Sequence, residues 1–363
     1  MKNRGQKTDP RTEQSVRGDV FYSPREILSL HPGKQTKKKN QKMKNFFASL
    51  FSSSPKEETE EEKAKNEQNN FDVLKYDGIR ARRMGKTDYA IKCFTEALAI
   101  QSDFETMSCL AEAYQSVNRR EDAIEVMNHM IELRPDDIPT RIARANMLFM
   151  VDKNEEAVKD CRDVIERDND SYLAWFLMAK AKKALGEKLA VIADLTKAIA
   201  IKDDFTDAYM LRAETLLLMG QATEALPDAE KAVSLAPEEE TVYIIRGSVR
   251  EALGEADAAE EDYQMAIDLN PFNDDAYMHK GKLLVARGNL DEAISFFDEV
   301  IEMRPEFAAA YAERGRAKNL KGDKDGAFLD LKKSIELNPE GREAQRLEGC
   351  HNNFEDMYKG GIF

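Results

Sequence analysis

The chain has 363 residues, of which 42% are hydrophobic and 34% are charged, and its formal net charge is −14. Residues 1–42 hold eleven Lys/Arg and four Asp/Glu, a balance of +7, so the remainder carries −21. Such an acidic body argues against nucleic-acid binding by the folded part, because phosphate contacts need a basic face. The sequence has no run of about 18 apolar residues, which excludes a membrane-spanning helix.

Residues 1–70 are predicted to be a disordered basic arm followed by a charged linker, because this composition buries too little apolar surface to offset ordering entropy. A solvated tail is favoured over contact with nucleic acid or an anionic membrane. Met43 opens a stretch that would itself make a sensible protein start, so one hypothesis is that translation begins there.

A short aromatic segment lies within this arm. Phe46, Phe47, Leu50 and Phe51 share one face of a short predicted helix. The segment is too short for a signal peptide. It is interpreted as a mobile arm or the start of packing onto the first repeat, with a weak interfacial anchor or a plug for a groove as the alternative.

From residue 71 to residue 341 the sequence repeats itself. Tyr209, Gly220, Ala225 and Pro237 recur thirty-four residues later as Tyr243, Gly254, Ala259 and Pro271, and the pattern continues in both directions. A fixed period of about 34 residues is typical of a helical repeat array. We divide the chain into eight units, at 71–103, 104–137, 138–171, 172–205, 206–239, 240–273, 274–307 and 308–341.

These units resemble the tetratricopeptide repeat family. The resemblance implies an all-α fold, a right-handed superhelical α-solenoid of helix-turn-helix repeats in which each unit supplies an antiparallel helix A and helix B. Glycine, or Asn118 and Asp152 in the second and third units, is expected to end helix A in a left-handed conformation. The Asp and Glu residues close to Lys or Arg are expected on solvated helix surfaces.

One position of helix A, which faces inward in a curved array, is large and apolar across the central units. We interpret these residues and their neighbours on the following turns as a partner-binding groove for an extended peptide or a partner helix. The alternative, which apolar stripes at helical spacing generally favour, is that they pack against the neighbouring helix A. The candidate residues are Ile142, Asn146, Phe149, Phe176, Lys180, Lys183, Met210, Glu214, Leu217, Ile244, Met278, Lys282 and Arg316.

Residues 342–363 are predicted to form a capping helix, at 342–349, and a C-terminal tail. Phe354, Met357 and Tyr358 share one helical face in this tail, followed by Ile362 and Phe363. Local packing that extends the cap is the simpler interpretation. Self-association through the tail is the sharper hypothesis.

No catalytic, cofactor or metal-binding motif is recognisable: the four histidines are scattered, and no P-loop or nucleophile-elbow spacing occurs. The four cysteines lack disulfide-framework spacing, which suits a reducing, cytoplasmic compartment. The resulting prediction is a non-enzymatic interaction scaffold or adaptor that binds a protein or peptide. The alternatives are a peripheral membrane or envelope-assembly factor tethered through residues 43–51, and an accessory subunit of an enzyme or secretion complex.

Overall fold

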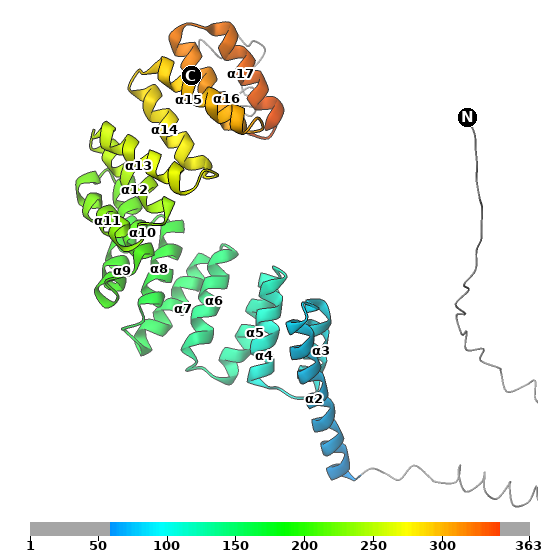
Figure 1. Ribbon diagram of the computed structural model, residues 1–363. Helices are drawn as coiled ribbons and strands as arrows, with labels where there is room; N and C mark the ends of the chain where they lie inside the picture. Colours follow the sequence, from blue (N-terminus) through cyan, green and yellow to red (C-terminus); the bar gives the residue numbers. More distant parts are fainter. Residues whose placement is uncertain (1–58, 342–363) are drawn as a thin grey trace, which may run out of the picture. The chain divides into compact units, whose positions relative to one another are not determined.

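The computed structural model describes residues 59–341, which form α-helices with no strand among them (Figure 1). The helices are α2 (Glu60–Arg83), α3 (Thr87–Ile100), α4 (Phe104–Ser116), α5 (Arg120–Leu133), α6 (Ile138–Met150), α7 (Asn154–Arg167), α8 (Tyr172–Ala184), α9 (Lys188–Ile201), α10 (Thr206–Leu218), α11 (Ala222–Leu235), α12 (Glu240–Ala252), α13 (Ala256–Leu269), α14 (Asp274–Ala286), α15 (Leu290–Met303), α16 (Ala308–Lys321) and α17 (Lys324–Leu337). The fold is an all-α solenoid of consecutive helical hairpins.

Each hairpin turns on one residue with a left-handed backbone. Glycine occupies that place in six hairpins, whereas Asn118 and Asp152 take it in the other two, with φ of 60° and 58°. Asn and Asp tolerate this region better than other side chains because their short polar groups bond locally. The sequence-based prediction for both residues is confirmed.

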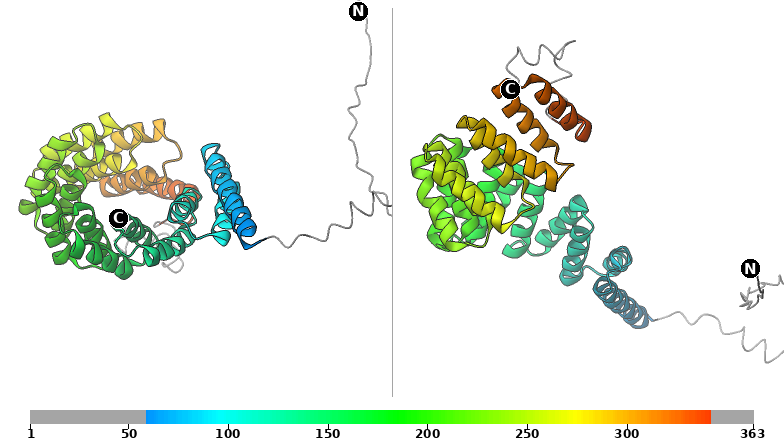
Figure 2. Two further views of the ribbon diagram at one scale, coloured as in Figure 1. Left: turned by 90° about the horizontal axis from the view of Figure 1, so that it is seen from below. Right: turned by 45° about the horizontal axis from the view of Figure 1, so that its top comes forward.

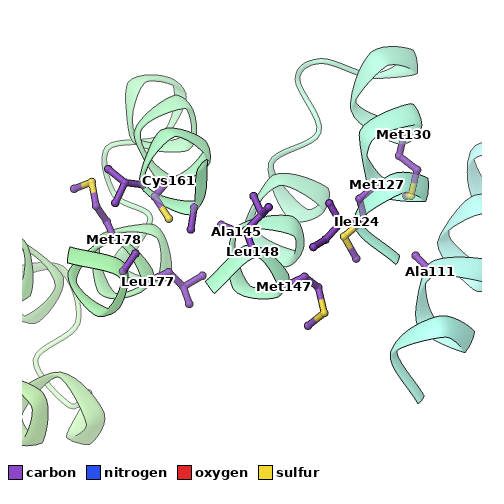
Figure 3. Packing of buried hydrophobic residues seen from close by; sticks show 13 residues of the cluster. Ala111, Ile124, Met127, Met130, Ala145, Met147, Leu148, Cys161, Leu177 and Met178 are labelled. Carbon is purple, nitrogen blue, oxygen red and sulfur yellow. The ribbon is translucent and has the colours of Figure 1, made fainter. Parts of the chain in front are cut away.

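The apolar core is a thin layer between successive hairpins rather than one central mass. Figure 3 shows one such layer, in which Ile124 and Met127 of α5, Leu148 of α6 and Cys161 of α7 lie between helices α4 and α8. From α4 onward, each helix A thus packs on its own helix B and on helix B of the preceding hairpin. This nearest-neighbour packing is what makes a solenoid nearly one-dimensional.

Helix A of each hairpin lies on the inner side of the array. Consecutive A helices pack against one another at α6–α8, α10–α12, α12–α14 and α14–α16, whereas no two consecutive B helices in residues 59–341 pack to the same extent. Elements that approach each other closely lie on the shorter, inner path of a curved stack. Figure 2 shows this curvature for the hairpins that follow α4.

Within each hairpin, a small residue of helix A is matched to the residue that follows it by sixteen positions in helix B. Gly78, Gly247 and Gly281 lie against the rings of Phe94, Tyr263 and Phe297, and a Cβ on Gly247 would lie 2.6 Å from Tyr263 Cε1. Where the later residue is not aromatic, alanine is tolerated, as in the pairs Ala111/Met127, Ala145/Cys161, Ala179/Leu195 and Ala213/Ala229. An aromatic ring in helix B therefore requires glycine in helix A, whereas Gly315, which is matched to Leu331, is a glycine without a ring opposite it.

The first hairpin starts earlier than its repeat pattern does. Helix α2 begins at Glu60, eleven residues before Phe71, and residues 59–70 are all exposed. The part of the expected charged linker from residue 60 to residue 70 is therefore helical. A boundary between two units of the chain falls within α2, between residues 66 and 67.

Several predictions concern residues outside the described range. These are the basic arm, the start at Met43, the aromatic segment 46–51, the capping helix 342–349 and the C-terminal tail. They remain predictions.

Candidate partner-binding groove

The five large apolar residues predicted to line the inner face are all half-buried. They lie on five successive A helices, α6 to α14, and each one packs partly against the core layer beneath it. Part of each side chain therefore packs against the core, and another part is accessible on the inner face. This geometry is intermediate between the two interpretations of the sequence, a binding groove and packing against the neighbouring helix A. The residues are Ile142, Phe176, Met210, Ile244 and Met278.

One cavity opens on this face. Its volume is about 670 Å³, and it extends from α6 across α8 to the start of α10. Four candidate residues line it, namely Ile142, Asn146, Phe176 and Lys180. The rest of the lining is mainly apolar and comes from Ile138, Pro139, Ala143, Leu173, Leu177 and Phe205, with Asp207 at the edge. This size and lining are typical of a site that accepts an apolar group.

Lys180 is the cationic side chain of this cavity. Its Nζ lies 4.7 Å from the ring centroid of Phe149 and 5.8 Å from that of Phe176. In the described part of the chain it forms no ion pair with a carboxylate. Two aromatic faces hold the ammonium in place by cation–π attraction, which leaves its hydrogen-bond donors available.

Sequence reasoning missed Phe205, although it forms one side of the cavity. Its ring meets Phe176 edge-on at 4.8 Å and Tyr172 edge-on at 5.2 Å, both typical aromatic geometries. Phe205 is the last residue before α10 begins, so it lies in the connection between two repeats. Helical spacing points only to positions of helix A, and Phe205 does not lie on one. Phe307, the residue before α16, is a second aromatic residue in such a connection, and this recurrence is the signal in the sequence.

The remaining candidates lie outside the cavity. Lys183 and Glu214 bind each other across α8 and α10, with Nζ 2.7 Å from Oε2. Lys282 and Arg316 both face Glu313, at 3.8 Å and 3.5 Å. Leu217 packs partly against the core near α11. The charged side chains among them form a polar border further along the inner face, and the structure does not bring any of these candidates into one pocket with Phe176.

A second set of polar residues is buried, contrary to the expectation that carboxylates near Lys or Arg lie on solvated surfaces. The aspartates of helix B concerned are at most 6% exposed, and a basic residue of helix A in the same hairpin holds each of them. The pairs are Arg144–Asp160, Lys182–Asp194, Arg212–Asp228, Arg246–Asp262 and Arg314–Asp330. They join the two helices of a hairpin.

Burial shifts the pKa of two groups in the B helices, Cys161 and Asp194. Burial raises the pKa of the Cys161 thiol to about 12, so this cysteine stays a protonated core residue. Burial also raises the pKa of Asp194, against the opposing hydrogen bond from Lys182. Within residues 59–341, no group of three His, Cys, Asp or Glu side chains is placed to hold a metal ion.

Comparison with known proteins agrees with this geometry. A sequence model of the tetratricopeptide repeat matches residues 210–274, 246–306 and 279–342. The chain is a tetratricopeptide repeat protein. The first of its repeats, before residue 210, form the same hairpins with the same left-handed turns. A search of curated proteins found no match.

Solved structures show the same tetratricopeptide repeat fold. A tetratricopeptide repeat protein from Parabacteroides merdae is 16% identical, with a TM-score of 0.55, over 67% of this chain and 96% of that one. A chain of the APC/C hetero-tetramer Cut9–Hcn1 is 15% identical, with a TM-score of 0.51, over 85% of this chain and 58% of that one. At these identities the likeness concerns the fold alone. None of the helices in residues 59–341 is long and apolar enough to cross a bilayer.

Proposed function

We propose that this tetratricopeptide repeat protein is a non-enzymatic adaptor that holds a segment of a partner protein along its inner face. The observation that carries the proposal is the apolar cavity of about 670 Å³ between α6, α8 and the start of α10. An apolar side chain of the partner would enter this cavity beside Phe176 and Phe205. Burial of one large side chain there contributes about 1.5–3 kcal/mol, enough to anchor a segment without fixing its full sequence.

The positive charge of Lys180 at the cavity supports a more specific proposal about the sequence of the partner segment. Lys180 offers an ammonium that is positioned by two rings, whereas the nearby Lys183 is already bound to Glu214. A partner segment with a carboxylate next to its apolar anchor would satisfy Lys180 while its side chain fills the cavity. We therefore expect the bound motif to pair a Phe, Leu, Ile or Met with an Asp or Glu.

The other three inner apolar residues extend the contact surface. Met210, Ile244 and Met278 continue the half-buried apolar row beyond the cavity. Methionine side chains adapt to different shapes because they are unbranched and polarizable. Such a row fits an extended peptide or one face of a helix.

The test is partner recovery by affinity purification from the source cell. The variant Phe176→Glu places a charge in the cavity and is expected to lose the partner that the wild type recovers. Leu189→Glu is the matched control, because Leu189 is exposed on helix B of the same hairpin. Circular dichroism must show that both variants keep wild-type helicity and thermal stability.

The charge prediction has its own matched pair of variants. Lys180→Met is expected to weaken the affinity for the recovered partner about tenfold. Lys183→Met should change this affinity little, because Lys183 is already paired with Glu214. A folded Phe176→Glu variant that retains every wild-type partner would contradict the groove. Equal effects of the two lysine variants would contradict the acidic motif alone.

A further inference from the structure

A hollow lies between the B helices of the first two hairpins, α3 and α5, above α4. Its volume is about 330 Å³. Its floor is apolar, with contributions from Leu98 of α3, Met107 and Leu110 of α4 and Val126 of α5. The hollow shares no residue with the cavity at Phe176, so it is independent of the proposed groove.

The next groove along the array holds a hollow of similar size with a different lining. This second hollow lies between α5 and α7 and has a volume of about 310 Å³. Arg144 and Asp160 take the places that Leu110 and Val126 have in the first hollow. Arg144 Nε lies 2.7 Å from Asp160 Oδ2, and the same guanidinium donates to Asn128 of α5. The two hollows thus have the same place in the repeat, but only the first has an apolar floor.

The second hairpin is the exception along the array. In each later hairpin a basic residue of helix A lies at the place of Leu110 or one turn beyond it, and it pairs with a carboxylate of a helix B. These residues are Arg144, Lys182, Arg212, Arg246, Lys280 and Arg314. In the second hairpin both the base and the acid are replaced by apolar residues, so neither charge is left buried alone and the fold is not penalised. The exchange leaves an apolar surface where the later hairpins carry an ion pair.

The rim of the first hollow is acidic. Asp122, Glu125 and His129 of α5 line it, and its lining includes no Lys or Arg. Arg119 pairs with Asp122 at 2.8 Å, whereas Glu125 forms no ion pair within residues 59–341. In the second hollow Lys159 takes the place of Glu125. The first hollow therefore presents an unpaired carboxylate beside its apolar floor.

Thr95 adds a hydrogen-bond acceptor at the same rim. Its hydroxyl donates to the carbonyl of Ile91 at 2.8 Å. Thr196, at the equivalent place in α9, makes the same kind of bond and also accepts one from Arg212 at 3.0 Å. Because Leu110 stands where Arg212 lies in its own hairpin, Thr95 accepts no such bond in the described part of the chain. Its oxygen is available to a donor from a partner.

We propose that the hollow between α3 and α5 is a second docking site, for a partner segment that pairs an apolar side chain with Lys or Arg. The apolar side chain covers Leu110 and Val126 in the floor. The neighbouring cation pairs with Glu125 and donates to Thr95 at the rim. This charge is opposite to the one that Lys180 favours at the inner cavity. An array with an acid-binding site among its A helices and a base-binding site among its B helices brings two different segments together.

The test is a titration of the full chain, isotope-labelled at its methionine methyl groups, with synthetic peptides and followed by NMR. The probes are three short peptides that share a central Leu and differ only in whether Lys, Glu or Ser flanks it. The Lys-flanked peptide is expected to shift the signal of Met107 with a Kd of about 1 mM or tighter. The Glu-flanked peptide should bind there at least about tenfold more weakly. Met210 and Met278, on the inner face, supply the reference signals.

Two variants test the floor and the rim separately. Leu110→Arg with Val126→Asp gives the first hollow the ion pair of the second one, and it should abolish the Met107 shift. Glu125→Lys should weaken the Lys-flanked peptide at least about tenfold. Glu121→Lys is the matched control, because Glu121 is exposed on the same helix but does not line the hollow. Circular dichroism must show wild-type helicity, and the exposed Glu125 keeps the test valid even if the double variant does not fold.

Several results would each overturn the proposal. These are a Met107 signal that the Lys-flanked peptide does not move, equal binding of the Lys-flanked and Glu-flanked peptides, and equal effects of Glu125→Lys and Glu121→Lys. A Met107 signal that moves with protein concentration alone would assign the hollow to a second copy of the chain and would overturn it as well.

Discussion

Arg212 and Asp228 lie sixteen residues apart and join the two helices of their hairpin through a two-pronged ion pair. Nε and Nη2 of the arginine donate to the two carboxylate oxygens, each at 2.6 Å. The hydrogen bond to Asp228 raises the pKa of Arg212. The same arginine–aspartate spacing recurs in three other hairpins, so one interaction fastens helix A to helix B at regular intervals along the array.

Removal of one partner should therefore be costly. Arg212→Met is expected to lower the free energy of unfolding by about 3–5 kcal/mol, because Asp228 is left buried without its cation. Replacing both residues, Arg212→Met with Asp228→Leu, should recover most of that loss. Thermal and urea unfolding followed by circular dichroism measure both. A double variant as unstable as the single variant would show that the cost does not come from the buried carboxylate.

A natural comparison lies in the fourth hairpin. Met178 takes the place of the arginine there, and Lys182, one turn later, binds Asp194 at 2.7 Å instead. Lys182→Met should consequently destabilise the chain by an amount similar to that of Arg212→Met. Lys183→Met, on the adjacent residue, supplies the control because Lys183 and Glu214 are more exposed and contribute about 1 kcal/mol or less.

The match between glycine and aromatic residues predicts a second set of effects. Gly281→Ala is expected to destabilise the chain by about 1–3 kcal/mol, because the new methyl group would overlap the Phe297 ring. Phe297→Leu in the same chain should relieve the overlap, so that the double variant is more stable than the sum of the single changes predicts. Gly315→Ala should cost less, since its Cβ would lie 3.1 Å from the nearest atom. Double-mutant cycles on melting temperature measure this coupling.

His279 should make stability depend on pH. Burial lowers the pKa of His279 from 6.5, Lys282 acts in the same direction and Glu251 opposes them; the ring also stacks on Tyr263 at 5.1 Å. The unfolded chain therefore takes up the proton first as the pH falls below 6.5. Stability from the neutral imidazole is present above that pH and is lost as the pH falls from 6.5 towards the pKa of the folded state.

The measurement is the melting temperature as a function of pH. His279→Gln should reduce its slope below pH 6.5, whereas His129→Gln should not, because His129 is exposed on α5. An unchanged slope in His279→Gln would show that other groups cause the acid sensitivity.

Replacement of Pro227 by alanine is expected to stabilise the chain. It lies inside α11, past the first turn, where it cannot donate a backbone hydrogen bond to the carbonyl of Thr223. Pro227→Ala is expected to stabilise the chain by about 1–3 kcal/mol, provided that the helix accepts the restored bond. Pro237→Ala, just after α11, should give no such gain. A lower melting temperature in Pro227→Ala would contradict this account.

The fold could be predicted from the sequence because the repeat period, the small residues and the left-handed turn positions each have a local physical cause. Asn118 and Asp152 were identified for that reason. The candidate site could be predicted only in part. Helical spacing placed Ile142 and Phe176 on the inner face, but it could not indicate that Phe205, from a connection, completes the cavity between them.

The burial of the aspartates in helix B could not be predicted for a related reason. Asp228, for example, resembles a surface residue when only its own helix is considered, since Lys231 lies three residues later. Their partners come from the other helix of the hairpin, sixteen residues earlier, and that distance is visible only when two helices are considered together. The recurrence of Arg and Asp at this spacing was the signal that could have revealed them.

The glycine–aromatic pairs also limit how such an array can be rearranged. Helix B of the seventh repeat carries Phe297, so it cannot be joined to a helix A with alanine at the matched place, such as that of the fifth repeat with Ala213. Exchange of single helices between repeats would create overlaps, whereas exchange of whole hairpins would preserve each matched pair. In this chain the hairpin is therefore the smallest piece that recombination, natural or engineered, can move intact.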